Sequence, residues 1–184
     1  AALSAGGDAP APAPGAAPLR DTNAILQDVI FHNALRGELP GLEQGYVVAC
    51  FFLDEIYREM ARLGTDVNAT LTQPLTKLVM QMPQFRSTDG FYSFDMSRHF
   101  LFYSLAQPGR TVEKARTFLA QVQRAWKNYM NISCTVGMAA PHAEPETSFY
   151  TVLEQAETNT TLRYVLGPGR IYDESYYPQF DPVT

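Results

Sequence analysis

The sequence predicts a layered α/β domain in which a mixed central sheet is flanked by helices. The run Tyr46–Leu53 is apolar without polar alternation and rich in β-branched and aromatic residues, which is typical of a strand buried on both faces. Segments with helical spacing of apolar residues alternate with such β-rich runs along the chain. Two helix-linked crossovers then flank a central hairpin, which is the arrangement of a ferredoxin-like core.

The elements follow one another in the order β-α-α-β-β-α-β-α-β. Only a few residues separate the β-rich runs 91–94 and 99–105, and this is the spacing of a hairpin. Thr111 is a helix N-cap, and apolar residues that include Trp126 recur behind it at helical spacing. The predicted elements are strand 46–53, helices 54–63 and 66–82, strands 91–94 and 99–105, a helix from Thr111 to about Tyr129, strand 131–140, helix 146–166 and strand 170–173.

Composition divides the chain into four parts. Residues 1–20 are rich in Ala and Pro and have few large apolar side chains, so we expect a disordered linker or tail. We expect residues 21–37 to form a leading helix, because Asp21 can cap it and Gly37 can end it; such a helix often carries a signal or the contact of a homodimer. We expect the domain itself to span 45–173, and 174–184 to form a linker toward a following domain.

The composition also excludes several partners. With 184 residues, of which 46% are hydrophobic, the chain can bury one core. A net charge of −5 provides no basic surface for nucleic acid, so we expect no direct nucleic-acid contact. No apolar stretch approaches the ~20 residues that span a bilayer, and no signal peptide is recognisable, so we expect no membrane contact and a cytoplasmic location. Cys50 and Cys134 lie in apolar runs and are expected to be buried and reduced.

Common catalytic motifs do not occur in the sequence. His32, His99 and His142 have no metal-ligand spacing with one another or with the cysteines, so no metal site is expected. The chain lacks a nucleophile elbow, a Walker loop and a dinucleotide-binding glycine motif. The aromatic residues of the hairpin could stack bases, but in an acidic chain they are better explained as core. No cofactor is therefore implied.

One strand points to a family. The residues Cys134-Thr-Val-Gly-Met-Ala139 resemble the Ser-Ile-Gly-(Val/Ile)-Ala strand of the GGDEF, or diguanylate cyclase, domain, and the order of elements over 45–173 is similar throughout. In that family the hairpin carries the signature Gly-Gly-Asp-Glu-Phe. Here the same place holds Asp95, Met96, Ser97, Arg98 and His99, so the signature is absent.

The resemblance implies a fold without its usual chemistry. A diguanylate cyclase needs acidic ligands for two metal ions and a glycine turn that lets the backbone approach guanosine triphosphate. The family places an aspartate at the end of the first strand, where Asp54 or Glu55 could fill the role; both residues also suit the exposed start of a helix. We therefore expect a degenerate GGDEF-like domain with no catalytic residues.

A narrower similarity suggests a regulatory role. The leading helix, the closing stretch from Tyr150 to Asp173 and the pair Tyr177-Pro178 resemble, in this order, the degenerate GGDEF-like domain found in some AraC-type response regulators. This resemblance implies a signal-transmitting domain of a transcription regulator. Its partners would be the other domains of the parent protein, and the DNA-binding part would lie outside this chain.

A possible ligand site remains. Arg86-Ser-Thr-Asp89 has the Arg-x-x-Asp pattern of the site at which the GGDEF family binds cyclic di-GMP, in similar register before the signature. Arg and Asp can both hydrogen-bond guanine, and Arg116 could supply a second positive charge. The alternative is a surface turn held by an ion pair. Three functions thus stay open: a regulatory module, a cyclic di-GMP receptor and a divergent nucleotide-using enzyme.

Overall fold

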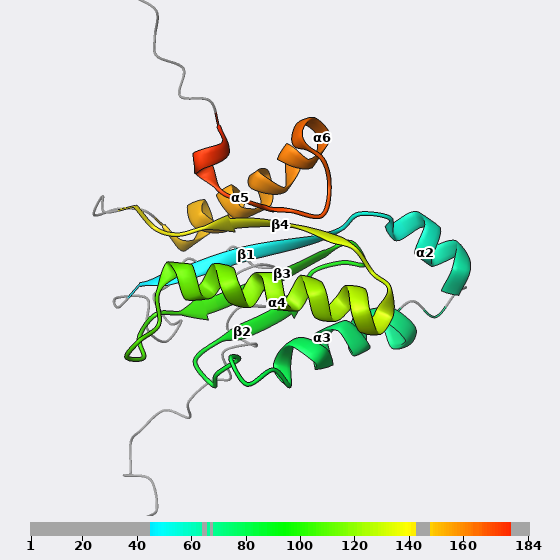
Figure 1. Cartoon of the computed structure of the whole chain (residues 1–184), viewed down its shortest axis with the longest axis horizontal. Coiled ribbons are helices and arrows are strands. Elements are labelled where there is room, and N and C mark those ends of the chain that lie inside the picture. The colour runs from blue at the N-terminus through cyan, green and yellow to red at the C-terminus, as the bar shows by residue number, and fades with distance from the viewer. Residues whose placement is uncertain (1–44, 64–65, 67, 143–147, 178–184) are drawn as a thin grey trace, which may run out of the picture.

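The computed structural model describes residues 45–63, 66, 68–142 and 148–177 (Figure 1). The predicted tail, the leading helix 21–37 and most of the C-terminal linker lie outside these residues. The described part confirms the layered α/β fold with a five-stranded sheet of order β2-β3-β1-β4-β5. Its strands are β1 (Tyr46–Leu53), β2 (Gly90–Ser93), β3 (Arg98–Ser104), β4 (Cys134–Ala139) and β5 (Ile171–Tyr172). The sheet is mixed, because β4 and β5 are parallel whereas the other neighbouring strands are antiparallel.

The central strand β1 is buried on both faces, as its apolar run predicts. Val47, Ala49 and Phe51 point into one hydrophobic cluster, and Val48 and Cys50 point into a second cluster on the opposite face. The first cluster is covered by α3 (Gln73–Met80) and α4 (Val112–Met130), and the second by α5 (Phe149–Asn159). Figure 1 shows these helices on the two sides of the sheet. Cys50 and Cys134 are both buried and free.

Helix α4 begins and ends at residues with clear capping roles. The Thr111 hydroxyl accepts a hydrogen bond from the Lys114 amide, and Asn131 ends the helix in the left-handed conformation with φ 56°. The fully buried Trp126 donates from its indole nitrogen to the Leu75 carbonyl at 3.2 Å. This bond joins α4 to α3 beneath the sheet. Because Asn131 has left the helix without entering the sheet, β4 starts later than the predicted residue 131.

On the other face, α5 packs closely against β4 at Gly137. A Cβ atom at Gly137 would lie 1.9 Å from the Ala156 carbonyl oxygen, so only glycine fits there. The buried Asn159 side chain donates to the Met138 carbonyl at 2.8 Å. All residues of β4 are buried, because α5 covers the face of this strand that lies opposite α4.

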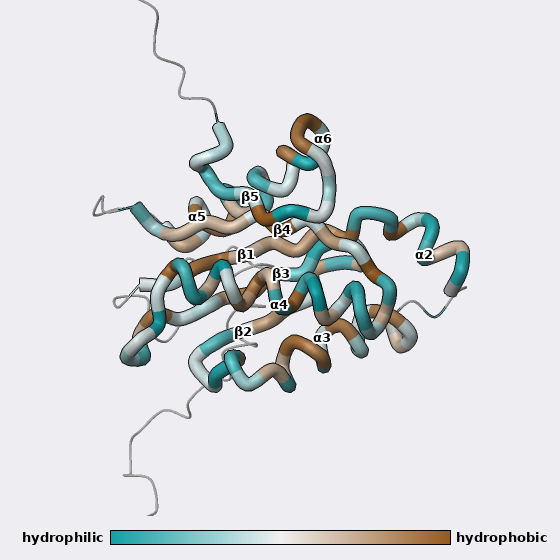
Figure 2. Tube along the Cα trace, in the orientation of Figure 1, coloured by the Kyte–Doolittle hydropathy of each residue, from teal (hydrophilic) through white to brown (hydrophobic). Residues whose placement is uncertain are grey.

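The helix predicted over 146–166 is divided into three parts. After α5, a 3-10 turn, η3 (Thr160–Leu162), changes the direction of the chain, and the short α6 (Arg163–Leu166) follows. The Thr160 and Thr161 hydroxyls bond to backbone carbonyls one turn earlier, which competes with a regular helix. Tyr164 and Val165 are therefore exposed, and Figure 2 shows hydrophobic residues on α6 at the edge of the molecule.

The first crossover is divided as well. It consists of α2 (Ile56–Leu63), a π-helical turn, η2 (Asn68–Thr72), and α3, which ends at Met80 before Pro83.

The closing strand β5 is followed by a single 3-10 turn, η4 (Glu174–Tyr176). No helix in the described part of the chain is long and apolar enough to cross a membrane.

Candidate functional site

The turn between β2 and β3 is held by the Asp95 carboxylate. Its Oδ1 accepts hydrogen bonds from the amides of Ser97 and Arg98, at 2.8 and 2.7 Å, and from the Ser97 hydroxyl at 2.8 Å. Its Oδ2 accepts from Arg98 Nε at 2.8 Å. Burial raises the pKa of Asp95, but the bonds from Arg98 and Ser97 outweigh burial and hold this pKa below its usual value. Asp95 is thus an ionised carboxylate used within its own turn.

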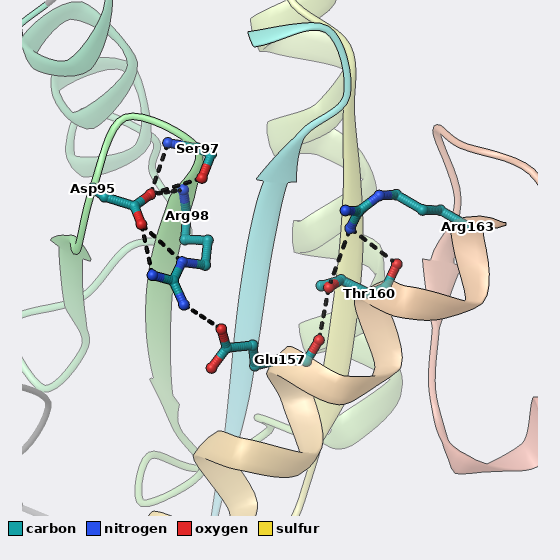
Figure 3. A network of polar contacts seen from close by, with 6 residues as sticks. All are labelled: Asp95, Ser97, Arg98, Glu157, Thr160 and Arg163. Carbon is teal, nitrogen blue, oxygen red and sulfur yellow. Dashed lines mark hydrogen bonds and ion pairs between the residues drawn. The ribbon is translucent and has the colours of Figure 1, made fainter. Parts of the chain in front are cut away.

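Arg98 connects this turn to the helix on the far side of the sheet. Its guanidinium bonds to Asp95 in the turn and to Glu157 on α5, as Figure 3 shows. It also lies over the Phe94 ring, 4.5 Å from the ring centroid. Figure 3 places Arg163 and Thr160 beside the same network, where the Arg163 guanidinium donates to the Thr160 carbonyl at 3.3 Å. We call Asp95, Arg98 and Glu157 the turn network.

The last residue of the signature position, His99, faces the core. It is fully buried, and its Nδ1 lies 2.7 Å from the Ser93 hydroxyl. Its ring is stacked on Phe91 and meets Trp126 edge-on. Burial lowers the pKa of His99 to about 4, so the imidazole is neutral at physiological pH. Met96 is partly exposed at the tip of the turn.

The end of β1 lies against the same turn, because the Leu53 amide donates to the Ser97 carbonyl at 2.9 Å. The Asp54 carboxylate that follows accepts from the Thr135 hydroxyl at 2.5 Å. Burial raises the pKa of Asp54 above its ordinary value, although Thr135 and Arg163 act in the opposite direction. Glu55 is exposed and pairs with Arg58 at 2.5 Å. Among the described residues, no group of three or more His, Cys, Asp or Glu side chains could hold a metal ion.

The Arg-x-x-Asp motif lies at a second place, in the turn before β2. Asp89 is buried, and both its oxygens are paired with the Arg110 guanidinium, at 2.7 and 2.8 Å. The Ser104 amide donates to one oxygen at 2.9 Å, and the Arg86 amide donates to the other at 2.8 Å. Arg110 lies flat over the Tyr103 ring, 3.6 Å from its centroid. Arg110 comes 21 residues after Asp89 and has no local signal that links the two.

A cavity of about 320 Å³ opens beside this ion pair. Exposed Arg86 lines it from the turn before β2, and Lys114 and Gln121 line it from α4. Among the positively charged side chains that line this cavity, Arg86 and Lys114 have no carboxylate partner in the described part of the chain. The charge of Arg110 is neutralised by Asp89. The wall consists of Gln84, Arg86, Tyr103, Gln107, Pro108, Gly109, Arg110, Lys114, Thr117, Phe118 and Gln121.

The structure does not bring Arg116 to Arg86. Arg116 lies on α4, but its guanidinium pairs with Asp173 after β5, and it is not part of the cavity wall. Residues at positions 114 and 117 face the cavity instead, because neighbouring positions on a helix point in different directions. Lys114, and not Arg116, is therefore the cation that α4 brings to the cavity wall beside Arg86.

Solved structures that are similar to this chain include GGDEF domains of diguanylate cyclases. The active GGEEF domain of a diguanylate cyclase from Vibrio cholerae matches with a TM-score of 0.60 and 12% identity, over 83% of this chain and 91% of that chain. The diguanylate cyclase SiaD from Pseudomonas aeruginosa, solved in complex with its activator SiaC, matches with a TM-score of 0.59 and 14% identity, over 85% and 60% of the two chains. The chain therefore has the GGDEF fold.

A third match is the GGDEF domain of DgcB from Caulobacter crescentus in complex with c-di-GMP, with a TM-score of 0.54 and 13% identity over 72% of this chain and 80% of that chain. No family model matches the sequence, and no curated protein matches it closely enough to count as a relative. The likeness is one of fold, at identities too low to carry an activity.

Proposed function

We propose that this chain is a non-catalytic GGDEF-fold domain that passes a signal to other domains of its parent protein. The turn network is the observation that carries the proposal. Where a diguanylate cyclase requires glycine and acidic metal ligands, this turn holds Met96, Ser97 and Arg98, and the Arg98 guanidinium joins Asp95 to Glu157. A fixed cation in the turn does not suit a pair of divalent metal ions.

The other carboxylates near the turn favour the same proposal. Asp95 is saturated by its own turn, and Asp54 is partly buried against Thr135 with a raised pKa. A metal ligand at neutral pH has to be ionised and accessible. The oxygens of Asp95 are occupied by bonds within its own turn, and partial burial restricts access to Asp54.

The regulatory role rests on the resemblance to the central domain of AraC-type regulators. The diguanylate cyclase SiaD, part of which has this fold, was solved in complex with its activator SiaC, so a protein that contains the fold can bind a protein partner. The net charge of −5 argues that DNA contact is made by another domain. A helix-turn-helix pair in the ~100 residues that follow this chain in the parent would support the proposal, and an unrelated following domain would contradict it.

An enzymatic assay tests the non-catalytic part directly. The purified chain is incubated with guanosine triphosphate and magnesium or manganese, and cyclic di-GMP is measured by liquid chromatography. We expect no product above a heat-inactivated control. Product at any rate that scales with protein concentration would contradict the proposal.

The cavity beside Arg86 favours a second function, that of a cyclic di-GMP receptor. Arg86 and Lys114 have no carboxylate partner among the described residues, although the Lys114 ammonium group donates to the Gly109 carbonyl. The cavity volume of about 320 Å³ lies within the range of small-molecule sites. The Asp89 carboxylate, however, already accepts from Arg110 the paired bonds that a guanine edge would donate. A guanine could reach Asp89 only by displacing Arg110.

Calorimetric titration separates this function from the first. Cyclic di-GMP at about 100 μM detects micromolar binding. If the cavity is a receptor site, Arg86→Ala and Lys114→Ala weaken binding and the exposed control Arg124→Ala does not. Absence of heat with the wild-type chain removes the receptor function and leaves the non-catalytic role intact.

A further inference from the structure

A second cavity, of about 220 Å³, lies at the end of the sheet where β4 and β5 terminate. These two strands are the parallel pair of the described sheet. The crevice outside the carboxyl ends of parallel strands is a common place for ligands in open α/β sheets. The wall is formed by residues of several elements, among them Val112, Met138, His142, Gln155, Glu174 and Ser175.

The hydrogen-bond donors of this wall are used within the wall. Gln155 Nε2 donates to Asn159 Oδ1 at 2.8 Å, and Asn159 Nδ2 donates to the Met138 carbonyl at 2.8 Å. The Ser175 hydroxyl donates to Asp173, whose carboxylate also pairs with Arg116. A ligand would therefore find few side-chain donors left to meet its acceptors.

The acceptors are in surplus. Among the described residues, the Gln155 carbonyl oxygen has no donor, and the Glu174 carboxylate meets only His142 Nε2, at 3.0 Å. Both members of this pair are about three-fifths exposed, 59% and 62%, so a solute can reach Glu174. Val112, Met138 and Ala139 add apolar surface beside these acceptors. The wall thus combines a carboxylate, a carbonyl acceptor and an apolar floor.

We propose that this cavity binds a small organic cation. Its ammonium group donates to Glu174 and Gln155, and its apolar body lies against Val112 and Met138. The volume is below that of drug-sized sites, which indicates a ligand of about one ring. Binding itself does not depend on the regulatory role proposed above. Glu174 begins η4, the last described element, so such a ligand contacts the segment that leads out of the domain.

The test compares two probes with the same body. Tyramine carries a phenol ring and an ammonium group, whereas 4-ethylphenol carries the ring alone. Each is titrated to about 10 mM into the ¹⁵N-labelled full chain, which detects millimolar affinity by NMR. We expect saturable shifts for tyramine at the amides of Met138, Gln155 and Ser175, and binding of 4-ethylphenol that is at least about tenfold weaker.

Two variants locate the site. Glu174→Gln, at an exposed position, is expected to weaken tyramine about tenfold, and Val112→Trp, at the cavity wall, is expected to abolish binding by filling the space. The control Glu55→Gln removes an exposed carboxylate elsewhere and leaves the affinity unchanged. The proposal is overturned if tyramine causes no saturable shifts at these amides, if 4-ethylphenol binds equally well, or if Glu174→Gln leaves the affinity unchanged.

Discussion

Arg110 and Asp89 form a two-point ion pair, with nitrogen to oxygen distances of 2.7 and 2.8 Å, between the turn before β2 and the residue that precedes the N-cap of α4. The side chain of Asp89 is fully buried and that of Arg110 is 8% exposed. The Arg-x-x-Asp motif is therefore part of a larger structural unit, in which the aspartate orders three backbone segments through Arg86, Ser104 and Arg110. The Asp89 carboxylate thus has a structural role in the fold that does not depend on a bound ligand.

Loss of this ion pair should destabilise the domain. Arg110→Ala leaves a buried, unpaired carboxylate, and we expect the free energy of unfolding to fall by about 3 kcal/mol. Urea denaturation followed by Trp126 fluorescence measures the change, with exposed Arg124→Ala as the control. A change below about 1 kcal/mol would mean that the pair is not a structural element.

Gly137 should tolerate no side chain. In Gly137→Ala the new Cβ would lie 1.9 Å from the Ala156 carbonyl oxygen and 2.8 Å from the Thr160 amide nitrogen, so α5 has to move. We expect a loss of about 3 kcal/mol in the free energy of unfolding. Thr158→Ala, at an exposed position of α5, is the control in the same thermal or urea denaturation series. Equal stability of the glycine and alanine forms would rule out the close packing of α5 on β4.

His99 should make stability depend on pH. Its pKa is lowered to about 4 in the fold, against an ordinary value near 6.5, so the unfolded chain binds a proton more readily. The contribution of neutral His99 to the free energy of unfolding is therefore fully present above about pH 6.5. This contribution is lost as the pH falls toward 4, by about 3 kcal/mol in total. Comparison with His99→Leu isolates this contribution from that of Asp54, whose raised pKa acts in the opposite direction. Parallel pH profiles for the two proteins would contradict the prediction.

Removal of the Arg98 side chain from the turn network should not give the domain diguanylate cyclase activity. Arg98→Ala removes the guanidinium from Asp95 and Glu157, but it restores neither the glycines nor a second metal ligand. We expect no cyclic di-GMP from guanosine triphosphate with this variant. We also expect a stability loss of about 1 kcal/mol, because these groups are partly exposed. Product formation by Arg98→Ala and not by wild type would identify the network as a reversible inhibitory contact.

The sequence by itself determined the layers, because local patterns encode them. The unbroken apolar run Tyr46–Leu53 became the central strand, and the spacing behind Thr111 became α4 with Trp126 in the core. The absence of glycine from the turn at Asp95 was also visible in the sequence. Such features depend on a residue and its near neighbours, so periodicity and capping are sufficient to predict them.

Only the tertiary structure decided how the charged side chains pair. Three ion pairs join residues that are far apart in the sequence. The separations are 21 residues for Arg110 and Asp89, 59 for Arg98 and Glu157, and 57 for Arg116 and Asp173. No local pattern connects such positions, because the pairing depends on which strands are neighbours and on which side of α4 a residue projects. The close packing of α5 on β4 at Gly137, and the bond from Asn159 to the Met138 carbonyl, likewise join segments that no local pattern connects.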